Sequence, residues 1–261
     1  MLSGNPGVKY MLIPSARHRP EDLSLWAELE EADLVHGQRL LRSGKVERSV
    51  AALLAFAAAG PCHLCLSGGK DSTALAGIAA LAGLSLPAVW FRAVPKHNPE
   101  IPAVFDVLGV SCEIVDYESP VPLRLTSLEA EAVAGRNFMA ACRAYEKEHG
   151  RRVLGVRADE SRVRLLKMKR WGLSTDNSCT PLGWWTVADV FGFLAVRGLP
   201  VHPTYAMLGG GRWKREDLRI DALMGERGDG RGRAEWEREY YGDVINRLLT
   251  SPTGTTGPRT P

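Results

Sequence analysis

The stretch that decides the fold spans residues 62–72 and reads Cys-His-Leu-Cys-Leu-Ser-Gly-Gly-Lys-Asp-Ser. Its apolar first part, residues 62–66, is typical of a short buried strand. Two adjacent glycines follow, where the chain can turn sharply, and an Ala/Leu-rich segment begins at Thr73. The pattern therefore predicts a strand, a tight turn and the start of a helix.

Residues 67–72, called the glycine loop below, have the chemistry of an anion-binding turn. The glycines let backbone N–H groups approach an oxyanion, and the first turn of a helix adds unpaired donors and partial positive charge. Lys70 adds a full charge, and Ser67 and Ser72 add hydroxyl groups. Asp71 could cap the helix or hold Mg²⁺ on a bound phosphate. The spacing excludes a Walker A loop and a dinucleotide fingerprint.

The glycine loop resembles the PP-loop of the N-type ATP pyrophosphatases. Within that superfamily the chain is most similar to the phosphoadenosine phosphosulfate (PAPS) reductase family, because three further segments follow in the family's order. They read Gly-Val-Arg-Ala-Asp-Glu-Ser-Arg-Val-Arg at 155–164, Pro-Leu-Gly-Trp-Trp-Thr-Val-Ala-Asp-Val at 181–190 and Leu-Pro-Val-His-Pro-Thr-Tyr at 199–205. The resemblance covers residues 46–212.

The resemblance implies a doubly wound, mostly parallel α/β sheet of the adenine nucleotide alpha hydrolase type. It also implies that ATP or PAPS binds with Mg²⁺ held by Asp71, and that Lys70, Asp71 and Arg157 take part in catalysis. The full set of implied nucleotide-binding residues is Ser67, Gly68, Gly69, Lys70, Asp71, Ser72, Arg157, Ser161 and Arg164. A guanidinium matches a phosphate or sulfate bidentately, which favours ligand binding by Arg157; the alternative is an ion pair with Asp159 or Glu160.

Strand and helix patterns alternate along the chain, which indicates βαβ units and a parallel sheet. The expected strands are 62–66, 86–93, 111–115 and 152–156, and the expected helices between and after them are 72–82, 99–108, 127–149 and 186–196. In such sheets ligands bind beyond the carboxyl ends of strands, where the strand order switches. The glycine loop and residues 157–164 both follow strands and should face one crevice. If Glu160 opens a helix, Arg157 and Ser161 share one edge of it.

Four segments describe the predicted organisation. Residues 1–45 form an N-terminal arm and helices, with 21–41 a helix or helix pair broken near His36 and Gly37. Residues 46–212 form the nucleotide-binding domain and begin with a helix at 46–59. Residues 213–250 form a C-terminal helical extension with helices at 217–224 and 234–249. Residues 251–261, rich in Pro, Thr and Gly, are expected to be disordered.

Composition is ordinary for a soluble globular protein, with 45% hydrophobic and 24% charged residues. No apolar run approaches the length of a membrane span, and the first residues lack the features of a signal peptide. Five scattered cysteines indicate reduced thiols and a cytoplasmic protein without membrane partners. Cys62 and Cys65 point to opposite faces of a strand, which favours buried apolar roles over a shared metal or disulfide.

Positive charge gathers in the second part of the chain. Residues 151–261 hold 19 Lys and Arg against 13 Asp and Glu, while residues 1–150 hold 14 against 17. Residues 162–171 carry five cations in ten positions, which could steer a nucleic acid toward the site or be a solvated helix face. The acceptor substrate, a sulfur-donating partner protein and a homo-oligomer all stay open.

Several single residues have two interpretations each. Cys179 could be a sulfur-carrying thiol or a buried structural one. His202 could touch a ligand or serve the core, and Glu100 could bind metal or ribose. Trp185, Thr186, Asp189 and Val190 are most simply packing and capping residues.

The chain departs from the family in three respects, one of which is the absence of the paired cysteines that bind an iron–sulfur cluster in related reductases. No cysteine follows Cys179, whereas the assimilatory reductases have a nucleophilic cysteine near the C-terminus. Arg92-Ala93 stands where family members often have Asp-Thr. The leading hypothesis is an enzyme that cleaves ATP at the α-phosphate to adenylate a substrate, with sulfur transfer as one version. A PAPS or APS reductase and a non-catalytic nucleotide-binding assembly subunit are the alternatives.

Overall fold

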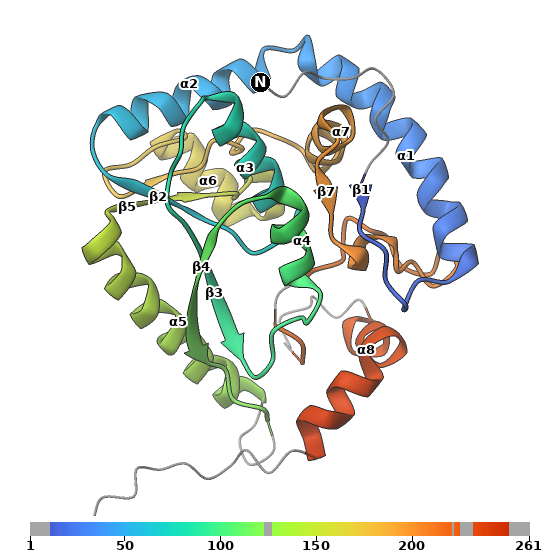
Figure 1. Cartoon of the computed structure of the whole chain (residues 1–261). Coiled ribbons are helices and arrows are strands. Elements are labelled where there is room, and N and C mark those ends of the chain that lie inside the picture. The colour runs from blue at the N-terminus through green and yellow to red at the C-terminus, as the bar shows by residue number, and fades with distance from the viewer. Residues whose placement is uncertain (1–10, 123–126, 221, 225–231, 251–261) are drawn as a thin grey trace, which may run out of the picture.

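The computed structural model describes residues 11–122, 127–220, 222–224 and 232–250. Its core is one five-stranded sheet in the order β4-β3-β2-β5-β6, in which every neighbouring pair is parallel (Figure 1). The strands are β2 (Cys62–Cys65), β3 (Ala88–Val94), β4 (Cys112–Glu118), β5 (Arg151–Leu154) and β6 (Ser178–Cys179). The predicted parallel α/β fold is confirmed.

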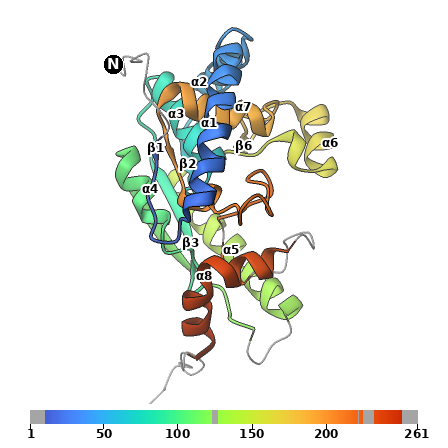
Figure 2. The same ribbon diagram turned by 90° about the vertical axis from the view of Figure 1, so that its right-hand side faces the viewer.

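Helices connect these strands as crossovers. Since such connections are right-handed, the helices that carry the chain from β2 to β3 and β4 cover one face, and the helix that brings it back to β5 covers the other. Figure 2 shows this arrangement. The three helices are α3 (Lys70–Leu81), α4 (Ile101–Leu108) and α5 (Ser127–His149).

A second helical layer covers α3. It consists of α1 (Pro20–Leu41), α2 (Lys45–Ala58) and α7 (Val187–Arg197), and the N-terminal strand β1 (Met11–Leu12) pairs in parallel with β7 (Pro200–Val201). Helix α3 is buried almost throughout because it lies between the sheet and this layer. The N-terminal segment is therefore packed around the helix that follows the glycine loop.

The remaining elements are α6 and α8 and two short 3₁₀ helices. Their bounds are η1 Ala158–Glu160, α6 Arg162–Trp171, η2 Pro203–Ala206 and α8 Arg233–Thr250. Helix α8 has a non-helical backbone at Tyr241, whose side chain is fully buried. No helix in the described parts of the chain combines the length and apolar composition that a membrane crossing needs.

Two helix predictions are wrong in detail. Helix α1 runs without a break through His36 and Gly37. Gly37 does not end the helix but allows α1 to pack closely on α7, because a Cβ there would lie 2.2 Å from the carbonyl oxygen of Gly192 on α7. The expected helix at 217–224 is also absent from the described residues of that range, which form turns and irregular chain. Leu218 and Ile220 are buried while Arg219 is exposed, a period of two that suits an extended segment.

We expect Gly37→Ala to lower the free energy of unfolding by about 1–3 kcal/mol, because the methyl group would force α1 away from the backbone of α7. Urea unfolding monitored by circular dichroism measures the change. Gly135→Ala is the matched control on α5, since a Cβ there meets nothing within 4 Å. The control should be neutral or stabilising by up to about 1 kcal/mol. Equal destabilisation of both variants would contradict the close approach of the helices.

Candidate nucleotide-binding site

A cavity of about 500 Å³ opens at the carboxyl ends of β2 and β5. These two strands mark the switch point of the sheet, because the chain proceeds from β2 to β3 and β4 on one side and returns to β5 on the other. Open parallel sheets bind ligands at this place. The lining residues are Ser67, Gly69, Lys70, Asp71, Ser72, Arg157, Asp159, Glu160, Val187, Tyr205, Glu216, Asp217, Leu218, Arg219 and Ile220. The prediction that the two post-strand segments share one crevice is confirmed.

The glycine loop has the predicted conformation of strand, turn and helix start. Gly68 has a φ of 75°, in the left-handed region that favours glycine, and a Cβ there would lie 2.9 Å from the Ile101 side chain. The Ser72 hydroxyl donates to the carbonyl oxygen of Gly69 at 2.9 Å, which closes the first turn of α3. The turn therefore requires glycine at position 68 and tolerates no side chain there.

Several backbone N–H groups of this loop have no acceptor within the described part of the protein. Gly69 occupies the N-cap of α3 and supplies no side chain to the first turn. Within the described residues, the N–H groups of Gly68 and Gly69 donate to no protein acceptor, and the N–H groups of a first helical turn have no partner inside the helix. The Lys70 N–H is the exception, since it donates to the Tyr205 hydroxyl at 3.2 Å. A concave set of donors of this kind is suited to binding an anion.

Lys70 places a buried charge beside these donors. Its side chain is 8% exposed, its Nζ lies 3.1 Å from Asp71 Oδ2, and its ammonium lies 5.3 Å from the centre of the Tyr205 ring. Burial acts to lower the pKa of Lys70, but Tyr205 and Asp71 outweigh it, so the pKa is raised. The lysine therefore stays charged at neutral pH and can attract an anion in the cavity.

Arg157 joins the two loops of the cavity. Its side chain is 5% exposed, Nε donates to Asp71 Oδ1 at 2.5 Å, and Nη1 donates to Asp159. Burial acts to lower the pKa of Arg157, and the charges of Asp71 and Asp159 raise it overall. The ion-pair interpretation of Arg157 is thus confirmed, with Asp71 as an additional partner. A guanidinium has five N–H donors, so donors are left for a ligand.

Two predicted ligands do not reach the cavity. Ser161 does not follow a helix opened at Glu160. Its backbone is extended, and its hydroxyl caps α6 by accepting from the Arg164 N–H at 3.2 Å. Arg164 pairs with Glu160 on the surface. Neither Ser161 nor Arg164 is among the lining residues, because the chain leaves the 3₁₀ helix η1 before α6 begins.

All five cysteines lie in described parts of the chain and are free thiols. None lines the cavity. Cys179 on β6 is fully buried, and burial raises the pKa of its thiol. Its Sγ accepts from the Ser174 hydroxyl at 3.3 Å. The structure therefore favours the buried structural alternative for Cys179.

His202 and Glu100 also have protein partners. His202 is fully buried, its Nδ1 accepts from the Thr204 N–H at 3.1 Å, and burial lowers its pKa to about 3. Glu100 accepts hydrogen bonds from Ser15 and, at 2.5 Å, from Tyr241. His202 caps the start of η2, Glu100 joins the segment at Ser15 to α8, and neither residue lines the cavity.

Sequence reasoning missed one wall of the cavity. Tyr205, Leu218 and Ile220 are buried lining residues that were assigned no role. Tyr205 ends the segment at 199–205, so its place in the motif was a signal that could have been followed. The alternation of apolar residues at 218 and 220 was a second signal, which the helix prediction obscured.

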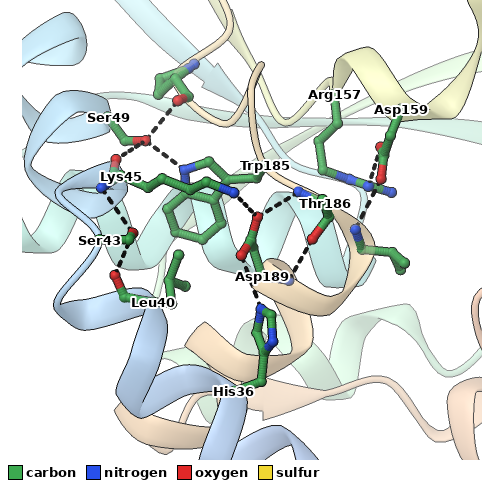
Figure 3. Close-up of polar contacts among 12 residues, drawn as sticks. His36, Leu40, Ser43, Lys45, Ser49, Arg157, Asp159, Trp185, Thr186 and Asp189 are labelled. Atoms are coloured by element: carbon green, nitrogen blue, oxygen red, sulfur yellow. Dashed lines mark hydrogen bonds and ion pairs between the residues drawn. The ribbon is translucent and has the colours of Figure 1, made fainter.

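The N-terminus of α7 is anchored beside the site by Asp189 (Figure 3). This carboxylate accepts from Lys45 Nζ at 2.5 Å, His36 Nε2 at 3.0 Å and the Thr186 N–H at 2.7 Å. The predicted capping role of Thr186 and Asp189 is confirmed, since Thr186 also accepts from the Asp189 N–H. This anchoring also positions the cavity wall, because Val187, which follows Thr186, donates its N–H to Asp159 at 3.0 Å.

Comparisons with known proteins find a likeness to solved structures alone. No family model matches the chain, and no curated protein matches it. Among solved structures, the NMN synthetase from Francisella tularensis is similar over 87% of this chain and 99% of its own, with 15% identity and a TM-score of 0.41. A likeness of this size supports no conclusion about activity, so the function is argued from the site alone.

We expect Asp189→Asn to lower the free energy of unfolding by about 1.5–3 kcal/mol at pH 7, since hydrogen bonds to a charged group are lost. Burial acts to raise the pKa of Asp189, but Lys45, the Thr186 N–H and His36 lower it below the ordinary 3.8. A carboxylate whose pKa is lower in the folded than in the unfolded protein stabilises the fold at pH values above the unfolded-state pKa. This stabilisation is lost as the pH falls through the folded-state pKa. The difference between wild type and variant should therefore shrink below about pH 4.

Urea unfolding from pH 7 down to pH 3 tests this dependence. Asp106→Asn is the control, because Asp106 is exposed on α4 and forms no salt bridge with the described residues. The control should differ little from wild type throughout. A difference for Asp189→Asn that is constant with pH would contradict the assigned role of the carboxylate.

Proposed function

We propose that this chain is a nucleotide-binding enzyme of the PP-loop ATP pyrophosphatase superfamily and is related to its PAPS reductase-like family. It cleaves ATP between the α- and β-phosphates and adenylates a substrate, in the manner of a transferase. The observation that carries this proposal is the set of unpaired N–H groups at Gly69 and in the first turn of α3, whose residues line one cavity with the buried ammonium of Lys70.

Charge and position decide the chemistry that such a cavity supports. The β- and γ-phosphates of ATP would rest in the glycine loop, with Lys70 and Arg157 on either side. A substrate oxygen attacks the α-phosphorus, the bond from that phosphorus to the bridging oxygen breaks, and pyrophosphate leaves with the electron pair. Preorganised donors stabilise the negative charge that grows on the leaving group. An external nucleophile, such as a sulfide or amine, then displaces AMP from the adenylated atom.

The residues present fit Mg²⁺ as a companion of the nucleotide. The described residues contain no cluster of three or more side chains able to hold a metal by themselves. Mg²⁺ is commonly held by one or two carboxylates together with phosphate oxygens, and Asp71 and Asp159 both line the cavity. When bound, Mg²⁺ would neutralise charge on the phosphates.

A thiol-dependent reductase is less well supported. Reduction of a sulfonucleotide needs a thiolate at the sulfur atom, and each of the five cysteines lies outside the cavity wall. Burial raises the pKa of Cys65 and Cys112 to about 12 and that of Cys142 to about 11, and it also raises the pKa of Cys62 and Cys179. A reductase activity would therefore need a thiol from another molecule.

We expect Lys70→Ala to reduce the release of pyrophosphate from ATP by about 100–1,000-fold, the usual effect of removing one electrostatic stabiliser. The measurement uses α- and γ-labelled ATP with product separation, because release of pyrophosphate and release of phosphate are then distinguished. Lys147→Ala, an exposed lysine on α5, is the control and should match wild type. Tight ATP binding without any turnover, in the presence of candidate acceptors, would favour a non-catalytic assembly subunit.

Cys179→Ala separates the adenylating enzyme from a reductase that uses its own thiol. We expect the variant to release pyrophosphate as fast as wild type, because the thiol is buried away from the cavity. The same protein should release no sulfite from PAPS in the presence of a dithiol. Sulfite release by wild type that disappears in Cys179→Ala would show that the reductase hypothesis is the correct one.

A further inference from the structure

Helix α6 (Arg162–Trp171) stands out from the body of the molecule (Figure 2). Met168 is its one buried residue. On the opposite side, Val163 is 76% exposed and Leu166 is 57% exposed. A helix that merely covers a core would hide these aliphatic side chains, so this face is available to a partner.

Four of the five cations of α6 have no ion-pair partner among the described residues. Arg162, Lys167, Lys169 and Arg170 are exposed and form no ion pair with the described residues, whereas Arg164 is neutralised by Glu160. No acidic residue occurs between positions 161 and 175. The helix thus presents four unpaired positive charges within nine positions, which is complementary to a chain of phosphates.

Tryptophan exposure singles out the same place. The protein has seven tryptophans, and five of them, at positions 26, 90, 185, 213 and 236, are at most 9% exposed. The other two are Trp171, at the end of α6 and 55% exposed, and Trp184, 45% exposed. Trp184 follows Gly183, whose carbonyl oxygen accepts from the N–H of Ala158 at the start of η1. Both exposed indoles therefore belong to the α6 region.

We propose that this region binds a single-stranded segment of nucleic acid. The α6 surface consists of Arg162, Lys167, Lys169, Arg170, Trp171 and Trp184. Cations contact successive phosphates, and exposed aromatic rings stack on bases, a combination typical of single-strand binding. The Arg170 guanidinium already lies 4.8 Å from the centre of the Trp171 ring, so the pair offers a flat, charged platform. Two aliphatic side chains on a ten-residue helix are a small anchor for a lipid interface.

The position of the α6 surface connects it with the cavity. Glu160 lines the cavity, and α6 begins two residues later at Arg162. A strand held along α6 would bring one of its nucleotides to the cavity mouth. This inference rests on the proposed function insofar as it makes a nucleic acid the acceptor that is adenylated, but binding itself needs no ATP cleavage.

Fluorescence anisotropy with the whole chain tests the proposal. The probe is a fluorescein-labelled single-stranded RNA or DNA of about 20 nucleotides, which exceeds one binding site of this kind. Lys167→Glu/Arg170→Glu should raise Kd at least about tenfold and reduce the slope of log K against log salt by about 1.4. Arg39→Glu/Arg48→Glu is the matched control, since it makes the same charge change at exposed positions of α1 and α2, and it should bind like wild type.

Aromatic variants test stacking separately from charge. Trp171→Ala should weaken binding about fivefold or more, and Trp171→Phe, which keeps a ring face, should recover most of the affinity. All four variants should bind ATP as tightly as wild type and unfold at the same urea concentration, because none of the substituted residues lines the cavity.

Three results would overturn the inference. The first is an equal loss of affinity in the Arg39→Glu/Arg48→Glu control. The second is that a wild-type protein that cleaves ATP binds neither oligonucleotide. The third is that the protein binds vesicles of anionic phospholipid in place of oligonucleotide. Oligonucleotide binding by a protein that never cleaves ATP would instead refute the proposed function and leave the α6 surface in place.

Discussion

The buried ion pair between Arg157 and Asp71 is the constraint on which the site depends. It joins the segment after β5 to the first turn of the helix after β2, and it is extended by the bond from Arg157 to Asp159. A guanidinium that is 5% exposed must keep its partners, because breaking one buried pair typically costs about 3–5 kcal/mol. The ion pair therefore holds the two loops that line the cavity at one separation.

The same charges bear on the ligand that we propose for the cavity, because they favour an anion that arrives with a metal ion. Lys70 and Arg157 carry two positive charges, and Asp71 and Asp159 carry two negative ones, so these four charges cancel. A highly charged anion alone would meet the two carboxylates. An anion that arrives with a divalent cation satisfies both sets of charges, which is the form in which ATP is usually bound.

Support for the cavity comes from distant parts of the chain. Asp189 ties α1 and α2 to the start of α7, Val187 then donates to Asp159, and Tyr205 reaches from η2 to the N–H of Lys70. His36 and Lys45 thus reach the carboxylate of Asp189, and Tyr205 reaches the amide of Lys70, from more than 100 positions away in the sequence. The α6 surface lies on the other side of η1, where the core gives it little cover and its side chains face solvent.

The role of the glycine loop as an anion site stays a prediction, whereas the parallel sheet and the strand–turn–helix at residues 62–81 were determined by the sequence itself. Those properties are local, since they depend on glycine conformations, short apolar runs and helix starts that neighbouring residues decide. The unbroken helix α1 at Gly37, the extended wall at Leu218 and Ile220, and the capping role of Ser161 were decided only by the tertiary structure. In each case a partner far along the chain, or the direction in which the chain leaves an element, overrides the local preference, and no local pattern encodes such a contact.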